Sequence, residues 1–281
     1  MSETTYRTHA YHAEATILEG HLRLPLAQQI QPQAYAKLPE EGGYIAQRSE
    51  DYRLESVISY RSAYTQVAGN LDVKPGHGWA TLTTSVVEGL NVLDVLTADR
   101  VVCQISTEHP LEGYVPSVSF LGTRFENLRI GGHLLDVYLD LDIVGSRPEG
   151  DRAYTTNPGF LERVASQYSR IREHQELPPD LAERYNRLSS TLGSPEAVEC
   201  SLVNRAAGGY PGKCCGHLLT IPNFGRVTLG KLTLCHEDFK AGTEIPEKTT
   251  LRLTMVDMEF GCAIAGRAAV GTGSTNGTTR P

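Results

Sequence analysis

Short runs of alternating apolar and polar residues, bounded by turn-forming residues, most constrain the fold of this chain. The clearest run is 136–143, in which Val137, Leu139, Leu141 and Ile143 alternate with polar positions. Successive side chains of a β-strand point to opposite faces, so this pattern predicts a half-buried strand. Similar runs occur at residues 56–60, 80–87, 100–107, 115–121, 125–130, 227–235 and 251–260. The chain is therefore expected to consist mainly of strands joined by turns.

Two of these runs carry more detailed predictions. In 100–107, Val101, Cys103 and Ile105 share one face, so Cys103 is expected to be a small core residue rather than a nucleophile. In 227–235 the apolar positions change parity at Gly230-Lys231, which predicts a β-bulge at that point.

One segment has helical spacing instead. Its apolar positions are Phe160, Leu161, Val164, Tyr168 and Ile171. Asn157 is suited to be the N-cap, because its side chain can accept a backbone hydrogen bond, and Pro158 suits the first helical position. The recurrence at intervals of three and four residues predicts an amphipathic helix packed against the core.

A second amphipathic stretch follows Pro178-Pro179. Leu181, Tyr185 and Leu188 share one face, and Gly193 is the expected C-terminal stop. Together the two stretches predict an α-helical hairpin inserted between two blocks of strands.

The pattern predicts an all-β fold, a β-sandwich or jelly-roll-like arrangement of antiparallel sheets with an inserted α-hairpin. Residues 1–150 form the first β block, 151–198 the helical insert, and 199–270 a second β block that completes the same domain. Residues 10–24 are expected to add an edge strand, with Ala15, Ile17, Leu22 and Leu24 facing inward. Residues 271–281 are small and polar, which predicts a tail that is flexible or ordered only by assembly.

Charge and hydropathy exclude several classes of partner. The net charge is −7, and no stripe of basic residues with interleaved aromatics occurs, so nucleic acid is not an expected partner. No apolar run approaches the roughly 18 residues of a membrane span. The N-terminus lacks the basic and apolar regions of a signal peptide, which favours a cytoplasmic location.

Two stretches resemble the bacterial choice-of-anchor P family of β domains. The first is SVVEGLNVLDVLTADRVVCQIST at 85–107, continuing to FENLRIGGHLLDV at 125–137, and the second is IPNFGRVTLGKLTL at 221–234 with TTLRLTMVDMEFGCAIAGRAAVG at 249–271. The resemblance covers about 85–145 and 216–271. It implies a secreted or surface-tethered β module without a catalytic motif, which makes an extracellular or surface location the alternative to the cytoplasm.

Thiols and imidazoles gather in the last third of the chain. The candidate metal ligands are Cys200, Cys214, Cys215, His217, Cys235 and His236. Thiolate and imidazole suit a tetrahedral zinc site if four of them converge. No CxxC pair is present, however, so the favoured interpretation is that these thiols are scattered in a β core and its loops and bind no metal. A disulfide from Cys200 to Cys214 or Cys215 is a further alternative for an exported protein.

No nucleophile elbow, phosphate loop or ordered catalytic triad occurs, so no catalytic residue and no resident cofactor are predicted. The paired acids Glu40-Glu41 and Glu50-Asp51 fall in polar segments expected to be loops. A flat carbohydrate-binding face is a separate alternative, and it would present Trp79, Tyr44, Tyr52, Tyr60 and Tyr64 to a glycan.

The leading hypothesis is a non-enzymatic structural protein of bacterial type that self-assembles into a homo-oligomer or filament. A zinc- or thiol-dependent protein and a carbohydrate-binding module are the two alternatives.

Overall fold

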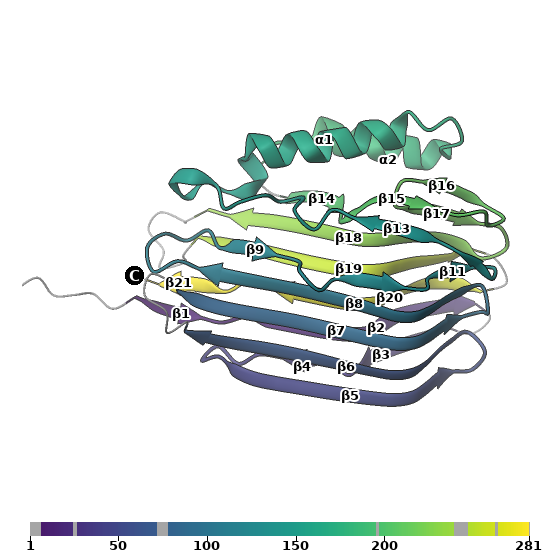
Figure 1. Cartoon of the computed structure of the whole chain (residues 1–281), viewed down its shortest axis with the longest axis horizontal. Coiled ribbons are helices and arrows are strands. Elements are labelled where there is room, and N and C mark those ends of the chain that lie inside the picture. Colours follow the sequence, from purple (N-terminus) through teal and green to yellow (C-terminus); the bar gives the residue numbers. More distant parts are fainter. Residues whose placement is uncertain are drawn as a thin grey trace, which may run out of the picture.

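The computed structural model describes residues 7–24, 27–71, 78–194, 197–238, 247–261 and 264–280. Its long strands form two large antiparallel sheets that face each other, and two α-helices run along one side of the sandwich (Figure 1). The all-β sandwich with a helical insertion is thereby confirmed.

The first sheet contains a meander of long strands. Its strands are β5 (Gly43–Leu54), β6 (Ile58–Leu71), β7 (Trp79–Val92), β8 (Leu96–His109), β9 (Ser117–Ser119), β10 (Arg124–Glu126), β11 (Arg129–Ile130) and β12 (His133–Leu134). Their order is β12-β11-β8-β7-β6-β5, and β9 and β10 also pair with β8. The runs at 80–87 and 100–107 thus lie inside β7 and β8.

The second sheet combines strands from both ends of the chain. Its strands are β2 (Ala13–Leu24), β3 (Gln28–Gln33), β4 (Ala36–Lys37), β14 (Ala197–Ser201), β16 (Lys213–Cys215), β17 (Leu218–Ile221), β18 (Gly225–Glu237), β19 (Lys248–Gly261) and β20 (Ala265–Thr275). Their order is β16-β17-β18-β19-β20-β2-β3, with β14 on β18 and β4 on β2.

The edge position predicted for residues 10–24 is wrong. The strand β2 lies inside the sheet, because β20 occupies one side and β3 the other. Ala15, Ile17 and Leu22 are buried as expected, but Leu24 is 51% exposed. The register between β2 and β20 shifts between Leu22 and Leu24, which turns the strand end away from the core.

Two short ladders complete the strands. The first joins β1 (Thr8–Ala10) to β21 (Thr278–Arg280), and the second joins β13 (Asp136–Leu139) to β15 (Val203–Ala207). The strand predicted at 136–143 therefore ends at Leu139. Beyond it the chain turns, and the Gly145 amide donates to the Asp142 carbonyl at 2.8 Å.

One core spans both sheets and the helical insert. Val101, Cys103 and Ile105 are fully buried in it, together with residues of the second sheet such as Leu253 and Val270. Burial raises the pKa of the Cys103 thiol to about 12, so Cys103 is the core residue that the sequence predicted.

The change of parity in β18 is real, but its geometry differs from the predicted bulge. Gly230 adopts φ +58°, a conformation that glycine reaches without strain. The pairing of β18 with β19 nevertheless keeps one register, with Leu229 opposite Val256 and Lys231 opposite Thr254. The strand β19 changes its buried face at the same point, because the consecutive residues Met255 and Val256 are both buried. The two strands therefore stay paired without an extra residue in either of them.

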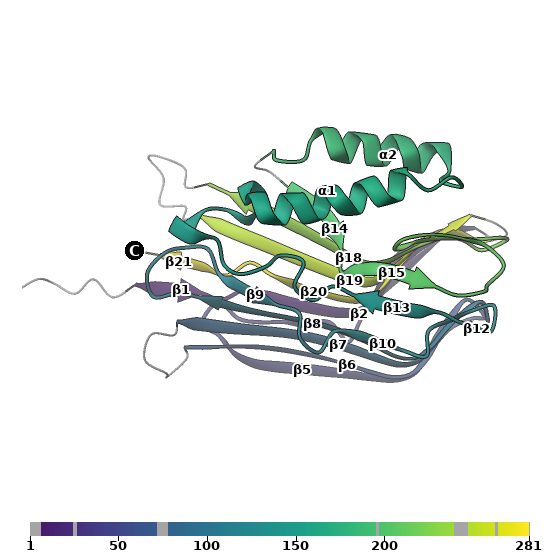
Figure 2. The same ribbon diagram turned by 45° about the horizontal axis from the view of Figure 1, so that its top comes forward.

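The helical hairpin packs by its predicted stripe. It follows two short 3-10 turns, η1 (Glu149–Asp151) and η2 (Tyr154–Thr156), and consists of α1 (Pro158–Arg172) and α2 (Pro179–Ser190). The Asn157 side chain accepts a hydrogen bond from the Phe160 amide at 3.0 Å, so the predicted N-cap is confirmed. In Figure 2 both helices cover the side of the sandwich farthest from β5.

The expectation that residues 271–281 form a tail that is flexible or ordered only by assembly is wrong for residues 271–280, which pair within the chain. Residues 271–275 end β20, and Thr278–Arg280 pair with β1. A Cβ atom on Gly273 would lie 2.9 Å from Thr83 Cγ2 and 3.3 Å from Cys103 Sγ. The absence of side-chain bulk, which suggested a mobile tail, is what lets β20 approach the first sheet.

Candidate functional site

The strand β5 is the last strand of the first sheet and pairs only with β6 within the described part of the chain. Eight of its 12 residues are exposed, among them Tyr44 at 61%, whereas Ile45 and Tyr52 are partly buried and Leu54 lies in the core. Glu50 and Asp51, expected in a loop, lie in this strand. An edge strand of this kind presents unpaired backbone N–H and C=O groups to another chain.

Opposite charges lie on one face of β5. Arg48 and Glu50 are two residues apart, and their side chains form an ion pair at 2.8 Å. Both are well exposed, at 72% and 58%, so water screens the pair. Their alternation along an open edge gives β5 a charge pattern that a second strand can match.

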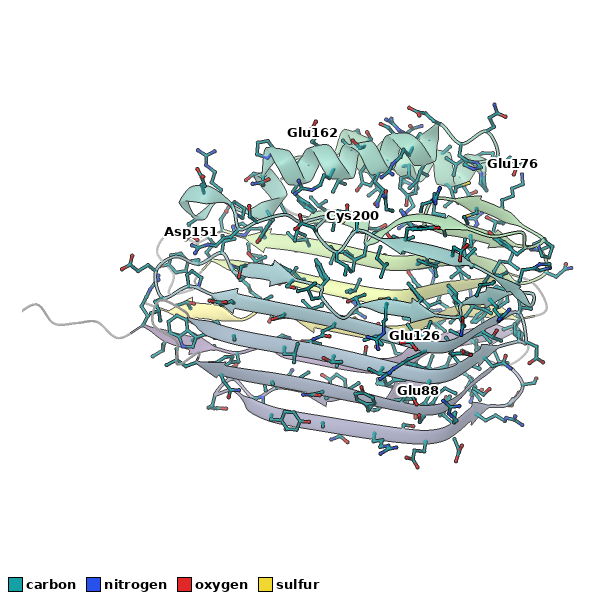
Figure 3. All side chains as sticks on the ribbon, viewed as in Figure 1. Glu88, Glu126, Asp151, Glu162, Glu176 and Cys200 are labelled. Atoms are coloured by element: carbon teal, nitrogen blue, oxygen red, sulfur yellow. The ribbon has the colours of Figure 1, made fainter. Side chains whose placement is uncertain are left out.

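The six candidate metal ligands do not converge. Cys200 lies opposite Leu232 in the β14–β18 ladder, whereas Cys235 lies opposite Ala197. Cys200 and Cys235 are therefore three rows apart, or about 10 Å along the strand, and an odd number of rows places them on opposite faces. Cys200 is buried beneath α1, where Figure 3 labels it.

Cys214 and Cys215 are separated by the same geometry. They are consecutive residues of β16, paired with Leu219 and Leu218, so their side chains point to opposite faces. The Cys214 thiol donates to the Ala206 carbonyl at 3.2 Å, and burial raises its pKa to about 11. A vicinal pair on a strand cannot direct both sulfurs at one ion.

Each of the two histidines has a partner outside the predicted cluster. His217 Nε2 lies 2.8 Å from the Tyr185 hydroxyl of α2, and burial lowers the pKa of His217 to about 3. His236 Nε2 lies 3.1 Å from a Glu247 carboxylate oxygen, and its Nδ1 lies 3.3 Å from Thr249 Oγ1. Burial raises the pKa of Glu247.

The zinc and disulfide alternatives thus gain no support from the geometry. In the ranges that the structure describes, no three His, Cys, Asp or Glu side chains come close enough to hold a metal ion. Cys200, Cys214 and Cys215 are free thiols.

The flat aromatic face proposed from the sequence is not formed. Trp79 is buried and stacks on His9 with ring centroids 5.3 Å apart. Tyr60 is buried against Tyr52, with ring centroids 5.0 Å apart. Trp79, Tyr52 and Tyr60 thus serve packing between strands, whereas Tyr44 and Tyr64 are exposed, at 61% and 37%.

A groove lies between α2 and the outer face of the second sheet. Its volume is about 490 Å³, within the range of small-molecule sites. One wall carries Arg184, Arg187 and Leu188 of α2, and the strands contribute charged side chains such as Lys231 and Asp257. The helix thus converts an otherwise open sheet face into a hollow.

Ion pairs tie α2 to the sheet beneath it. Arg226 of β18 pairs with Asp180 at the start of α2, and Arg184 pairs with Glu199 of β14. Lys231 lies 3.1 Å from Asp257 across two neighbouring strands. These contacts hold both walls of the groove in place.

The sequence pattern predicted neither the strand β5 nor this groove. The strand β5 buries only Leu54 fully and carries polar residues on both faces, so its sequence lacks the clear apolar–polar alternation on which strand prediction depends. Arg184 and Arg187, three residues apart on α2, were a detectable sign of a basic helix face. Their partners on β18 and β19 are distant in sequence and meet them only in the folded chain.

Comparison with known proteins adds a family but no activity. A family model described as a domain of unknown function matches residues 9–235. No curated protein and no solved structure matches. None of the described helices is both long and apolar enough to cross a membrane. The resemblance to choice-of-anchor P domains stays a prediction.

Proposed function

This chain belongs to DUF8256, a family described as a domain of unknown function, and from that premise we propose that it is a non-enzymatic structural protein whose copies associate through β5. The observation that supports this proposal is the open edge of a 12-residue strand. Figure 1 shows β5 at the side of the sandwich opposite the helices, as the last strand of its sheet.

Other edges of the two sheets are shorter. The first sheet ends on its other side in β12, which has two residues, and the second sheet ends in β16 and β3, which have three and six. Proteins commonly shorten or cover their edges because an exposed strand pairs with other chains. A long open edge is therefore a candidate for strand addition, in which a second strand extends the sheet.

The charges of β5 favour a second copy of the same strand. If two copies pair antiparallel about Ser49, Arg48 of each copy lies directly opposite Glu50 of the other. Opposite charges at directly facing positions stabilise antiparallel pairs by about 0.2–1 kcal/mol each. The arrangement has twofold symmetry, so it closes as a dimer.

Sedimentation velocity over a concentration series tests this proposal. The wild-type protein is expected to shift from monomer to dimer as concentration rises. Arg48→Glu and Glu50→Arg each place like charges opposite one another, so each single variant should remain monomeric where the wild type dimerises. The double variant Arg48→Glu/Glu50→Arg restores complementarity and should dimerise again, and so should a mixture of the two single variants.

Arg124→Glu on β10 is the matched control, because it alters an exposed ion pair with Glu126 away from the β5 edge. It should dimerise like the wild type. A wild-type protein that stays monomeric throughout, or single variants that dimerise unchanged, would overturn the proposal.

A further inference from the structure

We propose that the groove between α2 and the second sheet binds a sugar acid, a monosaccharide that carries a carboxylate. This site is independent of β5, because α2 and β5 lie on opposite sides of the sandwich (Figure 2). The groove also differs from the aromatic face that the sequence suggested for carbohydrate.

The balance of charge in the groove favours an anion. Five cationic and two acidic side chains line it: Arg184, Arg187, Arg226, Lys231, Arg267, Asp257 and Glu259. The whole chain, in contrast, carries a net charge of −7. Asp180 and Glu199, which pair with Arg226 and Arg184, bring the balance to five cations and four carboxylates. The groove is therefore a slightly positive region on a negative protein, and such a region favours an anionic ligand.

Arg187 is the cation best placed to receive the carboxylate. Arg184, Arg226 and Arg267 of the groove are engaged by Glu199, Asp180 and Glu259. Arg187, on the exposed side of α2, forms no ion pair with any residue that the structure describes. A guanidinium binds a carboxylate through two parallel hydrogen bonds, which fixes the orientation of the ligand.

The remaining lining suits hydroxyl groups rather than a nucleotide. Asp257 and Glu259 can accept hydrogen bonds from sugar hydroxyls, and they would repel the several charges of a phosphate chain more strongly than the single charge of a carboxylate. Among the described residues that line the groove none is aromatic, so a nucleobase would have no ring there on which to stack. Leu188 offers an apolar contact for the C–H groups of a sugar ring.

Titration of isotope-labelled protein, followed by amide NMR shifts, tests the site with D-glucuronate, D-glucose and inorganic phosphate as separate probes. Glucuronate is expected to shift amides of α2 and of the strands beneath it in a saturable manner. Glucose, which lacks the carboxylate, should bind at least fivefold more weakly. Phosphate, which lacks the hydroxyl-bearing ring, should also bind at least fivefold more weakly.

Two variants locate the contacts. Arg187→Gln should weaken glucuronate binding about tenfold and leave the weak glucose binding unchanged. Asp257→Asn should weaken both sugars. Arg124→Gln, on the other sheet, is the control and should bind like the wild type.

Three outcomes would overturn the inference. These are no saturable shift with glucuronate, glucuronate binding that survives Arg187→Gln, and phosphate or glucose binding as tight as glucuronate. None of these outcomes bears on dimerisation through β5, so the two proposals fail separately.

Discussion

The imidazole rings of His9 and His109 lie 4.6 Å apart, centroid to centroid, at the point where the N-terminal strand β1 meets the end of β8. His109 is 1% exposed, so its ring is removed from water. Burial lowers the pKa of His9 to about 4 and that of His109 to about 3. Both rings are therefore neutral in the folded protein at pH 7.

Acidification should destabilise the fold through this pair. The pKa of each histidine is lower in the folded chain than the value of about 6.5 in the unfolded chain, so protons bind the unfolded state preferentially. The stabilisation is complete above pH 6.5 and falls as the pH drops toward the folded pKa. For His109 alone the loss between pH 7 and pH 5 is about 2 kcal/mol.

Urea unfolding at pH 7 and pH 5 measures this loss. His109→Phe keeps a planar ring without a titrating group, so its free energy of unfolding should depend less on pH, by about 2 kcal/mol over that interval. His174→Gln changes an exposed histidine and should leave the dependence as in the wild type. An unchanged pH dependence in His109→Phe would contradict the assignment.

Gly273→Ala should destabilise the sandwich by about 1–3 kcal/mol, since the added methyl group would meet Thr83 Cγ2 at 2.9 Å. Thermal and urea denaturation measure the change. Gly209→Ala is the control, because nothing lies within 4 Å of a Cβ at that position. Combining Gly273→Ala with Thr83→Ser removes the facing methyl group and should recover part of the loss.

Asn157→Ala should cost about 1 kcal/mol of stability, because the Phe160 amide loses the side-chain acceptor that caps α1. Asn157→Asp retains a carboxylate oxygen at the same position and should keep most of the stability. Equal losses in the two variants would show that the cap hydrogen bond is not the cause.

Tyr185→Phe should cost about 1–3 kcal/mol, because it leaves His217 Nε2 buried without its hydroxyl partner. The same variant with His217→Leu removes both polar groups and should be less destabilised than the sum of the two single changes. A strictly additive double-mutant cycle, measured by urea unfolding, would contradict coupling between the two side chains.

Local sequence patterns predicted the strands that bury one face. The period of two in 80–87 and 100–107 predicted β7 and β8, because a strand with one buried face must alternate. The N-cap at Asn157 was also readable, because a cap is a contact between residues three positions apart. Such features depend on neighbours in the chain, and a single sequence contains them.

Other features depend on neighbours that only folding supplies. The strand β5 buries only Leu54 fully and so shows little alternation. Gly273 of β20 fits closely against Thr83 of β7 and Cys103 of β8, which are distant in the sequence. Cys214 and Cys215 are adjacent in the sequence, yet the pleat of β16 points them apart.

The sequence by itself determined the strand-rich class, the helical insert and the buried character of Cys103. The tertiary structure decided that β2 lies inside a sheet, that the thiols stay separate, and that α2 covers a charged sheet face to make a groove. The physical reason is distance along the chain. Alternation and capping act over a few residues, whereas strand order and groove walls join residues as far apart as Ala13 and Thr275.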